Sequence, residues 1–121
     1  MNFIYHITIS TDWDEALISG EYRADSLAAE GFLHASTILQ VEASANRYFA
    51  RLPTIVLLKI DLDRVRSPVI WEQSSHSEDP FPHIYGPLNL DSVVEVVPWN
   101  RSDKGRFVYP PSLPLQVKND H

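Results

Sequence analysis

Cysteine is absent from this chain of 121 residues, which excludes thiol nucleophiles, iron–sulfur clusters, cysteine zinc ribbons and a disulfide framework. Long apolar runs are absent as well. The longest, residues 55–58, is far shorter than the roughly twenty residues of a membrane-spanning helix. Basic residues are scarce, because ten Lys and Arg stand against sixteen Asp and Glu, a net charge of −6. We therefore expect no general binding to nucleic acid phosphates and no membrane span.

We expect no secretory signal peptide, because no basic segment precedes the first apolar residues and His6 interrupts them. With the absence of cysteine, this favours a cytoplasmic location. The length and the 44% hydrophobic share fit a single core. We predict one domain over residues 1–99 and a C-terminal appendage over residues 100–121, whose prolines disfavour regular structure and whose removal after Asn100 should leave the fold intact.

Hydrophobic periodicity predicts an α+β fold. Alternating or β-branched runs predict strands at residues 2–10, 32–36, 54–61, 69–72 and 92–99. Capping boxes that begin at Thr11 and Thr37 predict two main helices, residues 11–18 and 37–50, and a shorter helical turn falls within residues 22–30. The strand at 54–61 is the most apolar and should lie in the middle of a mixed or antiparallel sheet. The polar, proline-containing residues 73–82 predict a long surface loop.

Three of the five histidines lie inside apolar stretches and beside hydroxyl groups: His6 near Thr8, His34 near Ser36, and His83 near Tyr85. A buried imidazole needs hydrogen-bond partners, and its ordinary pKa of about 6.5 lets it donate, accept or carry charge. Three such residues in one small domain predict a shared polar pocket. Separate structural roles are the alternative.

Two charged residues are further candidates. Arg23 could clamp a phosphate or carboxylate, or it could pair with Glu21 or Asp25 on the surface. Glu72 ends a predicted strand and could orient a hydroxyl or stabilise a developing cation, unless it is simply solvated. Three histidines and Glu72 are suitable metal ligands, but two ligands one helical turn apart or alternating on a strand are missing, so we expect no metal.

Seven segments, in order between residues 3 and 98, together resemble the family called domain of unknown function 952, which consists of small bacterial proteins. The segments are IYHIT (4–8), YRADSL (22–27), EGFLHAST (30–37), NRY (46–48), LLKID (57–61), VIWE (69–72) and FPHIYGPL (81–88).

This resemblance implies a fold similar to that of ADP-ribosyltransferases, a split mixed or antiparallel sheet with two main helices and an NAD cleft between the sheet halves. In those enzymes the first strand carries Tyr-His-Gly-Thr, which residues 5–8 match except at Ile7. His6 and Thr8 would then face the ribose, and His34 or Ser36 would line the same cleft. RNA 2′-phosphotransferases of this group use His and Arg, which makes Arg23 a phosphate candidate.

The implied ligand is NAD or a related nucleotide or phosphorylated small molecule. Cleavage of an N-glycosidic bond builds positive charge on the ribose, so such an enzyme needs hydroxyl anchors, a stacking aromatic ring and often a carboxylate. His6 and Tyr85 could supply the hydroxyl anchor and the aromatic ring. Glu72 or His83 would be catalytic. Two other functions stay open: a binding module that lacks the chemistry, consistent with Ile7 in place of glycine, and a metal-dependent hydrolase using the three histidines. The oligomeric state is open as well.

Overall fold

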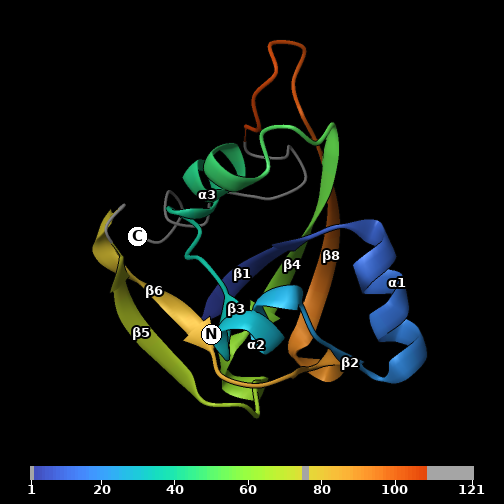
Figure 1. Ribbon diagram of the computed structural model, residues 1–121, viewed down its shortest axis with the longest axis vertical. Coiled ribbons are helices and arrows are strands. Elements are labelled where there is room, and N and C mark those ends of the chain that lie inside the picture. The colour runs from blue at the N-terminus through green and yellow to red at the C-terminus, as the bar shows by residue number, and fades with distance from the viewer. Residues whose placement is uncertain (1, 75–76, 109–121) are drawn as a thin grey trace.

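The central sheet of the protein is three-stranded and antiparallel. A computed structural model describes residues 2–74 and 77–108 (Figure 1). Strand β4 (Thr54–Asp61) lies between β1 (Phe3–Thr8) and β8 (Val93–Asn100). The most apolar strand is therefore central, as predicted, and its Leu57 and Leu58 side chains, which point to opposite faces, are both fully buried.

Each face of this sheet is covered by a separate hydrophobic cluster. On one face, helix α3 (Val41–Tyr48) packs over the first cluster, whose buried members are Tyr5, Ile7, Val41, Ala45, Ile55, Leu57, Val97, Trp99 and Phe107. On the other face, helix α1 (Ser10–Ser19) and the two smaller sheets cover the second, whose buried members are Ile4, Ala16, Tyr22, Leu33, Ala35, Leu58, Ile60, Ile84 and Leu88. The alternation of side chains along β1 supplies both clusters at once.

The two smaller sheets are also antiparallel. In one, β2 (Glu21–Tyr22) pairs with β7 (Leu88–Asn89); in the other, β6 (Ser77–Ile84) lies between β3 (Leu33–His34) and β5 (Val69–Ser74). The short helix α2 (Asp25–Glu30) precedes β3, and 3₁₀ turns follow β4 (η1, Leu62–Arg64) and β7 (η2, Leu90–Ser92). The molecule is thus one α+β domain whose described strand pairs are all antiparallel. Its two longer helices, α1 and α3, are the two that the sequence predicts.

The helix starts differ from those predicted. Helix α1 begins at Ser10, and its N-cap residue, Ile9, makes no side-chain cap, so the box predicted at Thr11 does not start the helix. At the second box, Gln40 Oε1 accepts a hydrogen bond of 2.9 Å from the Thr37 backbone N–H, which is half of a capping box, but regular helix begins only at Val41. Both helices still pack on the core, α1 through the buried Ala16 and α3 through the buried Val41 and Ala45.

The surface loop predicted for residues 73–82 is wrong, because most of this segment belongs to the β5–β6 hairpin (Figure 1). The two prolines of this segment suggest a loop, but both lie in β6 and their carbonyl groups accept hydrogen bonds. The Pro82 carbonyl accepts from the Ala35 N–H at 3.0 Å, and the Pro80 carbonyl accepts from Gln40 Nε2 at 3.0 Å. Residues 75–76 lie outside the described residues.

The first part of the predicted appendage returns to the core. Phe107 is fully buried, with its ring centroid 5.5 Å from that of Trp99. Its backbone is held by Asn46 of α3, which accepts from the Phe107 N–H and donates to the Phe107 carbonyl, both at 2.8 Å. Residues 109–121 lie outside the described residues.

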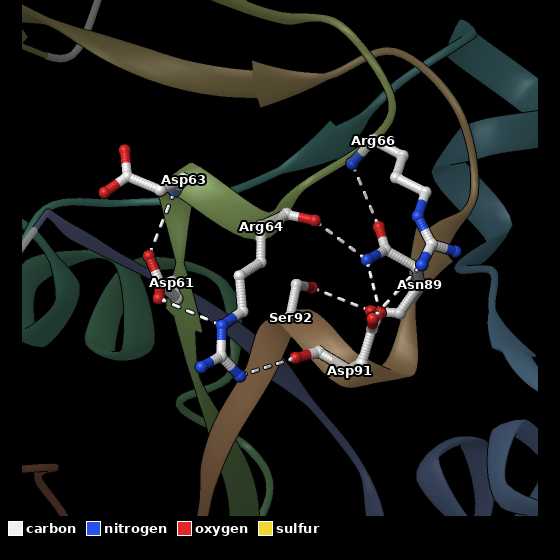
Figure 2. A network of polar contacts seen from close by, with 7 residues as sticks. All are labelled: Asp61, Asp63, Arg64, Arg66, Asn89, Asp91 and Ser92. Atoms are coloured by element: carbon white, nitrogen blue, oxygen red, sulfur yellow. Dashed lines mark hydrogen bonds and ion pairs between the residues drawn. The ribbon is translucent and has the colours of Figure 1, made fainter.

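A polar network fixes the end of β4 to the start of β8 (Figure 2). Arg64 pairs with Asp61 at 3.4 Å, and Arg66 pairs with Asp91 at 3.2 Å. The Asn89 amide donates to the Arg64 carbonyl at 2.9 Å. The network ties the connection between β4 and β5 to the residues that precede β8, so we assign it a role in holding the fold together. Across the described ranges, no helix combines the length and apolar character needed to cross a membrane.

Candidate functional site

The candidate site is built on one face of the β3–β6–β5 sheet. His34 pairs with His83 in the register of β3 and β6, and Leu33 pairs with Ile84. Because side chains alternate along a strand, the fully buried Leu33 and Ile84 face the core while the two histidines share the opposite face. The same alternation places Glu72 of β5 on the histidine face. The structure therefore brings together residues that lie far apart in the sequence.

An aromatic stack occupies the middle of this face. The Phe32 ring lies on the His83 imidazole with centroids 4.2 Å apart and planes 19° apart. The Phe32 centroid is also 4.7 Å from that of His34 and 5.1 Å from that of Tyr85. The two imidazoles are 5.2 Å apart, edge to face. Such contacts fix the ring orientations. Phe32 was not among the predicted site residues, although its alternation with His34 was a usable signal.

Glu72 holds the polar end of the stack. Its Oε1 accepts a hydrogen bond from the Tyr85 hydroxyl at 2.6 Å and lies 2.7 Å from His83 Nδ1. The Tyr85 bond, followed by the His83 bond, lowers the pKa of Glu72, while the same carboxylate raises the pKa of Tyr85. The Glu72 side chain is 38% exposed and that of His83 is 12% exposed. An ionised carboxylate is thus held in place yet stays reachable from solvent.

His34 is the most accessible imidazole of the site. Its Nε2 lies 2.6 Å from Oε1 of Glu30, the last residue of α2, and the two side chains are 54% and 51% exposed. Glu30 was also missed in the sequence, where the four-residue spacing from His34 was the available signal. Glu30, Phe32, His34, Glu72, His83 and Tyr85 are called the His–Glu cluster below.

His6 lies behind the cluster rather than in it. It is 6% exposed, its Nδ1 is 2.5 Å from the His34 carbonyl oxygen, and its Nε2 is 2.8 Å from the Tyr22 hydroxyl. That hydroxyl is also 2.9 Å from Thr8 Oγ1. Burial lowers the pKa of His6 to about 4 and raises that of Tyr22 to about 12. Both ring nitrogens are occupied within the protein, so His6 positions the backbone of β3.

Ser36 and Arg23 lie apart from the cluster. The buried Ser36 places its Oγ 3.1 Å from Ser44 Oγ, and its backbone bridges to Tyr5. The Arg23 guanidinium pairs with Glu21 at 2.6 Å on the surface, where both residues border a hollow beside α1. Of the eight residues predicted for the site, the structure therefore groups His34, Glu72, His83 and Tyr85, and places His6 and Thr8 behind them.

The three histidines do not form a metal-binding set. Among residues 2–74 and 77–108, no three His, Asp or Glu side chains are arranged to hold an ion. The reason lies in the partners of His6, which uses one nitrogen on the His34 carbonyl and the other on Tyr22. This placement gives the hydrolase alternative no ligand set.

A hollow of about 490 Å³ lies beside the His–Glu cluster, between α3 and the β5–β6 hairpin. None of the cluster residues lines it. The two are nevertheless adjacent, because Phe81, which lines the hollow, is the register partner of Glu72. His34, His83 and Glu72 thus meet in the cluster and not in the hollow.

The fold and the site define a small α+β protein with an exposed His–Glu–Tyr face. The chain belongs to the family described as protein of unknown function (DUF952), whose model matches residues 7–96. It is similar to protein CC0527 from Caulobacter crescentus. For the crystal structure of that protein, the identity is 27%, the TM-score is 0.81, and the match covers 88% of this chain and 94% of the other.

Two further structures of CC0527 agree. A crystal structure of a double mutant matches with 27% identity, a TM-score of 0.80, and coverage of 88% of this chain and 94% of that chain. A solution NMR structure matches with 28% identity, a TM-score of 0.74, and coverage of 88% and 91%. A search of curated proteins found no match. The family resemblance in the sequence is therefore confirmed, and these relatives name no function.

Proposed function

We propose that this protein binds NAD or a related phosphorylated nucleotide on the exposed face of the β3–β6–β5 sheet. The observation that carries the proposal is the Glu72 carboxylate, which Tyr85 and His83 hold by two short hydrogen bonds beside an aromatic stack. An ionised carboxylate next to aromatic rings suits a ribose attached to a planar base. His34 and Glu72, with more than a third of each side chain exposed, would make the direct contacts.

We further propose an ADP-ribosyltransferase-like arrangement. An isolated bridge between Tyr5 and Ser36 joins the central sheet to the β3–β6–β5 sheet at one point. This division of the strands into separate sheets supports the split-sheet arrangement that the sequence resemblance implies. In this proposal Glu72 stabilises the positive charge that develops on the ribose when the N-glycosidic bond breaks, and the lowered pKa of Glu72 keeps its carboxylate ionised for that role.

A binding module without catalysis is the second candidate, and the burial of His6 favours it. A transferase of the proposed type would use the histidine of the first strand to contact the ribose, but His6 is 6% exposed and both of its ring nitrogens have protein partners. The two candidates share the His–Glu cluster as ligand site and differ only in turnover.

Calorimetric titration of the full chain with NAD, ADP-ribose and a 2′-phosphorylated oligonucleotide tests the shared claim. We expect saturable binding of at least one of them, weakened at least about tenfold by Glu72→Gln, because the neutral amide loses a charge-assisted bond worth roughly 1.5–3 kcal/mol. Glu95→Gln, at an exposed position of β8, is the matched control and should leave the affinity unchanged. No saturable binding of any of the three would contradict the proposal.

Chromatography of the protein with NAD, alone and together with the 2′-phosphorylated oligonucleotide, separates the candidates, because it detects released nicotinamide and phosphate transferred from the oligonucleotide to NAD. Products that accumulate with time and disappear in Glu72→Gln identify a transferase. Saturable binding with no product identifies the module.

A further inference from the structure

The hollow between α3 and the β5–β6 hairpin has several large apolar side chains in its walls, beside the charged Arg47 and Asp79. Leu39, Tyr48 and Trp71 line it while being 71%, 64% and 45% exposed. Phe81 and Pro80 complete the hairpin wall, and the bond from Gln40 Nε2 to the Pro80 carbonyl ties that wall to the start of α3. Large apolar side chains gathered around one groove mark an interaction site rather than scattered surface residues.

The described chain ends near this groove. Asn46 holds the Phe107 backbone on α3, and the next two residues of the helix, Arg47 and Tyr48, line the groove. The Val108 carbonyl is fixed as well, by a hydrogen bond from the Trp99 indole. Extended chain advances roughly 3.1 Å per residue, so four residues cover about 12 Å, close to the diameter of one helix with its side chains. Residues from about 111 onward can therefore reach the groove.

The sequence of that segment matches the chemistry of the walls. It contains Pro111 and Pro114, separated by Ser112 and Leu113, which is the P-x-x-P spacing. Segments of this kind favour an extended left-handed helix and bind grooves lined by aromatic side chains, because little conformational entropy is lost on binding. Trp71, Tyr48 and Phe81 supply such a lining.

We propose that the groove between α3 and the β5–β6 hairpin is the docking site for residues 111–115 of the same chain. The groove and the His–Glu cluster share the hairpin, since Phe81 of the groove is paired with Glu72 of the cluster. A segment docked there flanks the approach to Glu72. The inference does not depend on the identity of the ligand, because it rests on the groove, the anchor at Phe107 and the proline spacing.

Paramagnetic relaxation in the full chain tests the docking. Since the protein has no cysteine, Ser112→Cys gives one nitroxide attachment point. We expect the oxidised label to remove most of the intensity of the Trp71 indole and Leu39 amide signals, and reduction to restore it. Adding Pro111→Ala and Pro114→Ala to the labelled chain should recover much of that intensity, because docking needs the two prolines. Broadening that comes only from the tether would not change when they are replaced. A label at Asp103→Cys, in an exposed turn, is the control for non-specific broadening.

Three outcomes would overturn the proposal. Intact Trp71 and Leu39 signals would exclude docking. Equal broadening with and without the two prolines would show mere proximity. Broadening of an isotope-labelled chain by a spin-labelled, unenriched second chain would show that the groove takes the segment of another copy instead. The groove substitution Trp71→Ala should weaken the broadening at Leu39, and a Trp71→Ala chain that keeps it in full would also contradict the proposal.

Discussion

Two ionisable side chains on either side of β3 meet opposite surroundings, and their pKa values move for different reasons. His6 is buried beneath the strand, where the lost hydration of its charged form is the largest influence on it. Glu72 lies on the outer face, where hydrogen bonds from Tyr85 and His83 favour its charged form. The inner residue is consequently suited to holding the strand in place and the outer one to meeting a ligand.

The burial of His6 predicts a pH dependence of stability. The pKa of His6 is about 4 in the folded protein and about 6.5 when unfolded, so the unfolded chain binds the extra proton between these values. The contribution of neutral His6 to the free energy of unfolding is then fully present above pH 6.5. It falls by about 3 kcal/mol as the pH decreases toward 4. Urea unfolding at intervals of half a pH unit measures this slope.

His6→Gln is the matched variant for that experiment, because glutamine keeps polar atoms but does not titrate. The variant should be less stable at pH 7 and should lose most of the dependence between pH 4 and 6.5. An unchanged slope in His6→Gln would assign the dependence to other groups.

The coupling between Glu72 and Tyr85 predicts a spectroscopic shift. The Glu72 carboxylate raises the pKa of Tyr85 by stabilising the protonated phenol. In Glu72→Gln that pKa should fall toward the ordinary value of about 10, because the neutral amide no longer opposes phenolate formation. Ultraviolet titration of the tyrosines measures the shift against Tyr85→Phe, which removes the transition altogether. Glu95→Gln should leave the titration unchanged, and a Tyr85 transition that does not move in Glu72→Gln would refute the coupling.

Among the elements, the β5–β6 hairpin contributes most to the site, and it is also the element that the sequence predicts least well. Strand β6 contains two prolines and two acidic residues, Glu78 and Asp79, all of which disfavour a strand by local propensity. It forms because Ile84 is fully buried and because β3 and β5 pair with it on both sides. Tertiary pairing overrides local preference here, so a reading of one segment at a time could not find it.

Elements whose signals are local were predictable. The apolar pattern of β4 sets both its position and its burial, and α1 ends at Gly20, whose lack of a side chain allows a positive φ of 97°. His34 and His83 could be predicted to meet because each lies in an apolar stretch beside hydroxyls. From the sequence alone, His6 and Arg23 looked like equally good site residues. His6 is buried behind β3 and Arg23 pairs with Glu21 on the surface, and both placements depend on the tertiary structure.

The turn that leaves β6 predicts a steric effect at Gly86. A Cβ at this position would lie 2.5 Å from Ser67 Oγ, and Ser67 is itself fixed by its bond of 2.7 Å to the Pro87 carbonyl. Gly86→Ala should lower the free energy of unfolding by roughly 1–3 kcal/mol, the usual cost of overpacking. Thermal unfolding checks this against Gly105→Ala, where the φ is 80° but nothing lies within 4 Å of the added carbon. Equal losses in the two variants would show backbone strain alone, without the clash.

At the scale of the whole molecule, the two hydrophobic clusters lie on opposite faces of one central sheet and are closed by different parts of the chain. The cluster under the His–Glu face is closed by β3, β6 and α1, while the cluster under α3 is closed in part by Phe107. Residues beyond β8 therefore contribute to the core, although their composition suggests an appendage. The proline-rich composition predicts no regular structure beyond β8, but it gives no sign that the Phe107 ring is buried.

Truncation separates these two interpretations of the C-terminal part. A chain ending at Asn100 loses Phe107, its contact with Trp99 and both backbone bonds to Asn46, and removal of a buried Phe side chain typically costs about 3–5 kcal/mol. A chain ending at Val108 keeps all of them. Urea unfolding should place the shorter chain well below the full-length protein and the longer one close to it, with Phe107→Ala in the full chain reproducing most of the loss. Equal stability of the chain ending at Asn100 and the full-length protein would instead support an appendage from residue 101 onward, and α3 would then need no partner beyond the central sheet.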